Sequence, residues 1–151
     1  MSEKFKALVV NQNGEDFTRE IQSLDKSFLK HGDVLVKVEY SGLNYKDALI
    51  LKNGAKLVKE FPHIPGIDFS GTVVESENKN FKTGDQIILT GRRVGEIYFG
   101  GYSQLAKVNG DFLVKKPVYF LKTSDDFRNR WDYSAYLCVH NKTSKRGVVA
   151  W

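Results

Sequence analysis

Apolar and polar residues alternate along several short stretches of the chain, which is the pattern of half-buried β-strands. Stretches of this kind, or β-branched runs bounded by glycine, predict strands at residues 5–12, 33–42, 69–76 and 85–91. A further pair of strands is predicted within residues 101–116, around the dipeptide Asn109-Gly110, because Asn-Gly suits a type I′ hairpin turn. Turns are also expected at Asn13-Gly14, at Gly32-Asp33 and at residues 81–85.

One stretch predicts a short helix instead. Residues 44–54, NYKDALILKNG, offer Ala48, Leu49 and Leu51 as core candidates, and Asn53-Gly54 supplies a helix stop signal. Many short strands and a single short helix are typical of a small β-barrel or sandwich. The pattern therefore predicts a mainly β fold.

Composition places the chain among ordinary globular proteins. With 151 residues, of which 41% are apolar and 27% charged, we expect one domain with its own core. No apolar run approaches the roughly 20 residues needed to span a bilayer, and the start lacks the apolar segment of a secretion signal. We therefore expect a cytoplasmic protein with no membrane partner. The single cysteine, Cys138, cannot form an internal disulfide and is expected to be a buried small hydrophobe.

The formal net charge of +5 would attract anionic partners. Nucleic acid is not expected, because the lysines and arginines are spread along the whole chain, with no basic run between aromatics and no Cys/His finger. A phosphate-bearing small molecule fits the same charge equally well.

Four motifs follow one another along the chain: LNYKDALILKNG (43–54), FPHIPGIDFSGTV (61–73), FKTGDQIILTG (81–91) and VGEIYFGGYSQLAKVNGDFLV (94–114). Over about residues 4–117 their order closely resembles the amino-terminal, GroES-like domain of the medium-chain dehydrogenase/reductase superfamily. The match is to the quinone oxidoreductase-like branch, which includes the NADPH-dependent acrylyl-CoA reductases. The resemblance implies a GroES-like small β-barrel with one or two short helices, and an NADPH-dependent oxidoreductase.

Zinc-dependent members of the superfamily have a cysteine near the place of Asn44 and a Gly-His-Glu near Gly66-Ile67-Asp68. Both ligands are missing here, so no metal site is predicted. His63 lies nearby without a second His or Cys at ligand spacing, and is expected to be structural or solvent-facing. Asp68 is expected to be a hydrogen-bond acceptor rather than an acid. A metal-free site has to stabilise developing negative charge with hydrogen-bond donors such as Tyr and Lys.

The resemblance places Tyr45 at the nicotinamide end of NADPH, as a cofactor contact and a candidate donor to the reacting carbonyl. Asn44 is expected to contact the cofactor as well and to orient Tyr45. Two interpretations of Lys46 and Asp47 stay open. They form a charged pair that shapes the site or relays a proton, or they belong to a solvated first helical turn in which the helix dipole favours Asp47.

The loop at residues 90–104 resembles the segment that borders substrate and cofactor in this family, with matches at Gly95, Glu96, Gly100 and Gly101. Arg92 and Arg93 depart from the family, which usually carries an aromatic residue and a Gly or Asp there. Two arginines can bind a phosphate or carboxylate bidentately, or remain solvated. Elsewhere, Gly66 and Gly71 are expected at backbone positions where a side chain would block a turn or a close approach.

The family's Rossmann domain, with its Gly-rich turn for the pyrophosphate of NADPH, has no counterpart in these 151 residues. We therefore expect a GroES-like catalytic domain at 1–117 and an irregular tail at 118–151. Codons for residues 125–134, DDFRNRWDYS, can be chosen that spell MILGTAGITA one base later, as the family reads there. We hypothesise a partly out-of-frame tail, which resequencing the locus would test. The other view is a genuine short protein whose tail forms one helix.

Two functions stay open. The first is the catalytic-domain part of a zinc-independent, NADPH-dependent oxidoreductase that reduces an activated C=C, in an acryloyl-CoA-like thioester or a quinone. The alternative is a non-catalytic GroES-like binding module that has lost cofactor binding. Without a partner domain, the barrel is expected to self-associate through exposed apolar surface.

Overall fold

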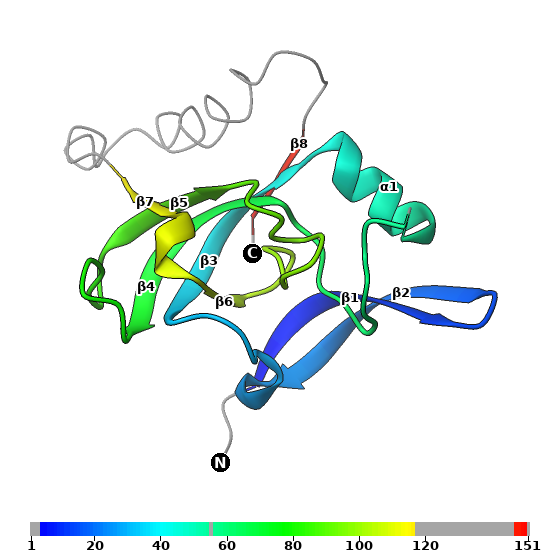
Figure 1. Cartoon of the computed structure of the whole chain (residues 1–151), viewed down its shortest axis with the longest axis horizontal. Coiled ribbons are helices and arrows are strands. Elements are labelled where there is room, and N and C mark those ends of the chain that lie inside the picture. Colours follow the sequence, from blue (N-terminus) through cyan, green and yellow to red (C-terminus); the bar gives the residue numbers. More distant parts are fainter. Residues whose placement is uncertain (1–3, 55, 117–146, 151) are drawn as a thin grey trace.

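The computed structural model describes residues 4–54, 56–116 and 147–150. These residues form two antiparallel sheets and one α-helix, joined by turns and loops (Figure 1). The predictions made for Cys138 and for residues 118–146 lie outside them. The α-helix is α1 (Tyr45–Asn53), and two short 3₁₀ helices are η1 (Lys26–Phe28) and η2 (Gly110–Phe112). The strands are β1 (Lys4–Asn13), β2 (Asp16–Asp25), β3 (Val34–Leu43), β4 (Asp68–Ser76), β5 (Gln86–Thr90), β6 (Leu105–Val108), β7 (Leu113–Lys115) and β8 (Gly147–Ala150).

The strands β1 and β2 form a long hairpin that turns at Gly14, as Asn13-Gly14 predicts. The sequence pattern does not predict β2, because most of its side chains are exposed and show no apolar alternation; Ile21, for example, is 67% exposed. Strand β1 shows the alternation, since Phe5, Ala7 and Val9 are buried in one cluster. The backbone pairing with β1, rather than side-chain burial, defines β2.

The larger sheet has the strand order β6-β3-β4-β5-β7. Strand β8 pairs with residues 40–43 of β3, whereas β6 pairs with residues 34–37 on the same side. Alternate residues of β3 (Val34, Val36 and Val38) point into the main core cluster, where they meet Val73 of β4 and Leu89 of β5. Among the described strands, β6 and β7 at the two ends are not paired with each other, so the curled sheet stays open between them. The predicted mainly β fold with one α-helix is confirmed.

The helix predicted at 44–54 is confirmed as α1, and it ends at Gly54, which has a φ of +70° and donates its N–H to the Ile50 carbonyl at 2.8 Å. The predicted core side chains are wrong in part. Ala48 is exposed, Leu49 and Leu51 are half-buried with Leu51 packed against the core, and Ile50 and Asp47 are fully buried. Residues three apart share a helix face, so the buried Asp47 places Ile50 inward.

The hairpin predicted around Asn109-Gly110 is wrong. Strand β6 pairs with β3 and strand β7 pairs with β5, so these two strands diverge instead of pairing. Asn109 has a φ of −69°, whereas a type I′ turn needs positive φ. Its side-chain oxygen accepts the Asp111 N–H at 2.9 Å and caps η2.

Of the described segments, none is a helix with the length and apolarity needed to cross a bilayer.

Candidate functional site

A buried carboxylate fixes the start of α1. Asn44 precedes the helix in an extended conformation, and its N–H donates to Oδ2 of Asp47 at 3.0 Å. The other oxygen of Asp47 accepts the N–H groups of Gly66 and Ile67 at 3.2 and 3.1 Å. One side chain therefore ties the beginning of the helix to the turn that leads into β4.

Asp47 is fully buried, and burial raises its pKa from 3.8 to about 6, with the nearby Asp68 adding to the rise and the three N–H donors opposing it. At neutral pH the carboxyl is ionised, which suits a group that only accepts hydrogen bonds. The predicted charged pair of Lys46 and Asp47 is therefore wrong, and of the other interpretation one part holds: Asp47 lies in the first turn of α1, but it is buried rather than solvated. It lies out of solvent, and its recorded partners are backbone N–H groups rather than Lys46.

Asn44 and Asp68 are hydrogen bonded to each other. The Asn44 side-chain amide donates to Oδ2 of Asp68 at 2.9 Å, and the Gly91 N–H donates to the other oxygen at 3.1 Å. Asp68 thus has the expected acceptor role. The recorded partner of the Asn44 amide is Asp68, and the expectation that Asn44 orients Tyr45 stays a prediction.

Lys46 binds a different carboxylate from the one expected. Its Nζ lies 2.7 Å from Oε1 of Glu96, on the loop that follows β5. The Glu96 side chain is 8% exposed, whereas that of Lys46 is 53% exposed. This ion pair joins α1 to the loop, so the two segments singled out from the sequence are in contact.

Lys46→Gln is expected to lower the free energy of unfolding by about 1 kcal/mol, because Glu96 loses a partner whose amine is only half-buried. Urea denaturation at low and high salt would measure it, and added salt should shrink the loss. Lys52→Gln, in the last turn of the same helix, is the matched control and should cost less. Equal losses for the two variants would contradict a stabilising role for the ion pair.

Glycines allow the turn before β4 and the loop after β5 to approach closely. Gly66 has a φ of +105°, and a Cβ there would lie 2.6 Å from the Tyr102 nitrogen. Gly95 has a φ of +78°, and a Cβ there would lie 2.8 Å from the carbonyl carbon of Gly66. Gly100 is as tight, since its Cβ would lie 2.3 Å from the Gly66 oxygen. Only glycine fits these contacts.

His63 has a structural role, and the solvent-facing alternative is wrong. The ring is 1% exposed, and Nε2 lies 2.9 Å from the Gly95 carbonyl oxygen. Burial lowers the pKa of His63, so the neutral ring donates this hydrogen bond. This hydrogen bond fixes the loop at Gly95 from its buried side.

Arg92 and Arg93 are exposed and have left-handed backbone conformations, with φ of +53° and +61°. Left-handed geometry costs a residue with a side chain about 1 kcal/mol or more. Backbone hydrogen bonds stabilise this turn in spite of that cost. The Val94 N–H donates to the Gly91 carbonyl at 3.0 Å, and the Ile97 N–H donates to the Arg93 carbonyl at 2.9 Å. The turn therefore presents two guanidinium groups on a fixed backbone.

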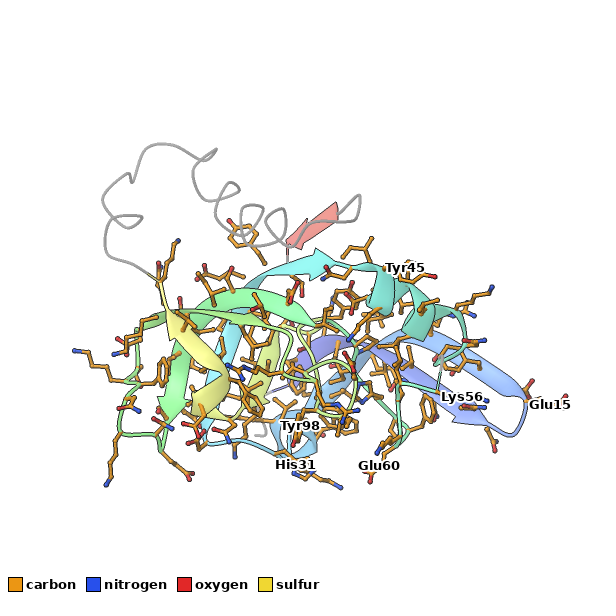
Figure 2. The ribbon with its side chains drawn as sticks, turned by 45° about the horizontal axis from the view of Figure 1, so that its top comes forward. Glu15, His31, Tyr45, Lys56, Glu60 and Tyr98 are labelled. Atoms are coloured by element: carbon orange, nitrogen blue, oxygen red, sulfur yellow. The ribbon has the colours of Figure 1, made fainter. Side chains whose placement is uncertain are left out.

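Tyr45 is the first residue of α1 and is 69% exposed. Figure 2 shows it at the surface where β3 leads into the helix. The phenol therefore lies outside the core, and Asn44 and Lys46 are the neighbours of Tyr45 in the chain. Two cavities, of about 330 and 310 Å³, lie elsewhere, and Tyr45 lines neither of them. The predicted contact of Tyr45 with a nicotinamide stays a prediction.

The structure thus brings most of the predicted residues to one junction, where the start of α1, the turn at 66–68 and the loop at 91–101 meet. Two of its contacts were missed. The Ser41 hydroxyl donates to the Gly101 carbonyl at 2.7 Å, and the Tyr102 hydroxyl donates to the Gly42 carbonyl at 3.1 Å. They join positions 60 apart in the chain, and no local pattern marks either residue.

Curated relatives match this chain along most of its length. The acrylyl-CoA reductase AcuI of Ruegeria pomeroyi is 48% identical over 115 residues, which cover 75% of this chain and 35% of the relative. The putative quinone oxidoreductase YhfP of Bacillus subtilis is 43% identical over 140 residues, covering 93% and 42%. The chain thus spans well under half the length of these relatives.

Solved structures show the same partial coverage. Escherichia coli K-12 YhdH with bound NADPH superposes with a TM-score of 0.71 at 47% identity, covering 74% of this chain and 34% of that one. Bacillus subtilis YhfP with NAD bound gives a TM-score of 0.73 at 42% identity, covering 77% and 35%. Residues 30–118 match the family model of the alcohol dehydrogenase GroES-like domain. The chain therefore belongs to the alcohol dehydrogenase GroES-like domain family, within the medium-chain dehydrogenase/reductase superfamily.

Proposed function

We propose that this chain is the catalytic-domain part of an NADPH-dependent oxidoreductase that works without zinc and reduces either the activated C=C of an acryloyl-CoA-like thioester or a quinone. The similarity to an acrylyl-CoA reductase and to an NADPH-bound structure supports the reaction and the cofactor. The observation that carries the proposal is the exposed phenol of Tyr45, on a helix whose start the buried Asp47 fixes.

The Asn44–Asp68 hydrogen bond supports a site without zinc. Zinc in proteins prefers thiolate, imidazole and carboxylate ligands, and a neutral amide is a poor substitute. The family resemblance puts Asn44 near the place of a cysteine in zinc-dependent members, and the Asn44 amide donates to Asp68 at 2.9 Å. The second oxygen of Asp68 is engaged by the Gly91 N–H. Polarisation of the substrate therefore falls to hydrogen-bond donors.

When bound, NADPH would supply the hydride that adds to the β-carbon of the activated double bond. Tyr45 would contact the nicotinamide and donate its hydroxyl proton in a hydrogen bond to the substrate carbonyl, where negative charge develops. The α-carbon would take its proton from water or a protein group, which completes the reduction. Asp47 is a positioning residue, because it acts through the backbone N–H groups that it binds.

A chimera tests this function. Residues 4–116 would replace the corresponding segment of Escherichia coli YhdH, whose structure they match at 47% identity. We expect the chimera to oxidise NADPH with acryloyl-CoA or with a quinone. Tyr45→Phe should lower kcat about tenfold, since one hydrogen bond to developing charge is lost.

Tyr98→Phe is the control, because the Tyr98 side chain lines the 330 Å³ cavity and packs against Phe112, although its backbone belongs to the loop of the junction. Unchanged kinetics in Tyr45→Phe would remove Tyr45 from the mechanism. A folded chimera that turns over neither substrate, beside active YhdH, would favour the non-catalytic binding module.

A further inference from the structure

We propose that Arg92 and Arg93 form an anion-binding pair beside the candidate site and that this pair binds the phosphate groups of a coenzyme A thioester. The inference rests on the proposed function and deepens it, because it selects the thioester over the quinone as substrate. It assigns a specificity-determining role to two residues that depart from the usual family pattern.

The backbone of the pair is the first observation. Gly91, Arg92 and Arg93 follow one another with φ of +69°, +53° and +61°. Such conformations persist in residues other than glycine only where the surroundings impose them, and they gather at functional sites. Here the Arg93 carbonyl accepts the N–H groups of Ile97 at 2.9 Å and Glu96 at 3.2 Å. The two side chains are therefore presented from a preorganised turn.

The charge balance around the pair is the second observation. Neither guanidinium makes an ion pair or a hydrogen bond with another residue in the described part of the chain. The carboxylate of the same loop, Glu96, is bound by Lys46 at 2.7 Å. Both oxygens of Asp68 accept other hydrogen bonds, from Asn44 and Gly91. Two positive charges are left for an external anion.

The position of the pair is the third observation. The Gly91 N–H, directly before the arginines, donates to the Ile67 carbonyl at 3.0 Å and to Asp68 at 3.1 Å. Asp68 in turn binds Asn44, the neighbour of Tyr45. This chain of hydrogen bonds links the backbone directly before the arginines to the start of α1. In the proposed complex, the reacting end of the substrate lies at Tyr45 and its charged group lies at the arginines.

The chemistry of the ligand follows from the side chains. Guanidinium groups match phosphate oxygens in shape and bind them bidentately. Coenzyme A carries several phosphate charges, whereas a quinone carries none. Pantetheine has the thiol arm of coenzyme A without its nucleotide phosphates, so it is the matched neutral probe.

The test is a binding titration of the 151-residue chain with coenzyme A at low salt, followed by the backbone amide signals of residues 91–95 in NMR spectra. Arg92→Gly and Arg93→Gly should each raise the Kd for coenzyme A by about three- to tenfold. Both variants should keep or raise the melting temperature, because glycine is at ease at positive φ. Pantetheine should leave the signals of residues 91–95 unchanged.

Lys56→Gly is the matched control. Lys56 is exposed, has a φ of +58° and follows the far end of α1, so the substitution removes the same charge from the same backbone geometry away from the pair. It should leave the Kd for coenzyme A unchanged.

Three results would overturn the proposal: an unchanged Kd in both arginine variants, equal binding of pantetheine, or arginine variants that weaken NADPH binding but not that of coenzyme A. The chimera with YhdH separates this idea from the proposed function. If arginine-dependent binding of coenzyme A occurs without turnover, the pair stands and the function fails. If turnover occurs with an unchanged KM for acryloyl-CoA in the double variant, the function stands and the pair fails.

Discussion

Gly66→Ala is expected to lower the free energy of unfolding by about 3 kcal/mol or more, because two costs add. The first is the φ of +105°, which a residue with a Cβ adopts only with strain. The second is steric, since the new Cβ would lie 2.6 Å from the Tyr102 nitrogen and 2.7 Å from the Gly101 nitrogen. Both are backbone atoms, so the whole loop would have to move. Urea denaturation followed by circular dichroism would measure the loss.

Gly84→Ala separates the two costs. Gly84 has a φ of +91°, similar to that of Gly66, but a Cβ there would meet nothing within 4 Å. Its replacement should cost only about 1 kcal/mol, from backbone strain alone. If the two variants lose equal stability, the close approach of the turn to the loop is not a determinant of the fold.

Asp47→Ala is expected to lower the free energy of unfolding by about 3 kcal/mol at neutral pH, because it leaves the N–H groups of Asn44, Gly66 and Ile67 without their acceptor. The loss exceeds that of an ordinary surface carboxylate, since Asp47 is fully buried. Asp16→Ala, at the exposed end of the β1–β2 hairpin, is the control and should cost little. A comparable loss in both variants would contradict the role given to Asp47.

The same variant has a distinctive pH dependence. Folding raises the pKa of Asp47 from 3.8 to about 6, so between these values the folded chain holds a proton that the unfolded chain has released. The contribution of Asp47 to stability therefore falls as pH rises through this window and is constant above it. The loss caused by Asp47→Ala should be larger near pH 4 than at neutral pH, and denaturation at several pH values would measure the difference. A loss that grows as the pH rises would show the opposite sign of pKa shift.

Local patterns predicted much of this fold. The alternation in β1 and β3 and the stop signal at Gly54 place two strands and α1 correctly, because each depends on neighbours in sequence. Strand β2 was missed because its exposed side chains carry no alternation, and only pairing with β1 defines it. The hairpin at Asn109 failed for a similar reason, since the partners of β6 and β7 are the distant strands β3 and β5.

The same distinction between local patterns and long-range contacts applies to the candidate site. Sequence motifs identified the residues at 44–47 and the loop at 90–104, and the structure brings the two segments into contact. The partners within them were assigned wrongly. Lys46 binds Glu96, 50 positions away, and Asp47 binds the N–H groups of Gly66 and Ile67. Adjacent opposite charges suggest a pair, whereas neighbouring helical residues point in different directions.

Apart from the Lys46–Glu96 ion pair, the described contacts that stabilise the junction come from buried groups, mostly backbone atoms. Asp47 and Gly66 act on N–H and carbonyl groups, whereas Tyr45, Arg92 and Arg93 are exposed and have no recorded part in the packing. Substitutions at these exposed positions should therefore leave the architecture intact. Mutational scanning of the chain should find a tolerant outer layer directly above an intolerant one.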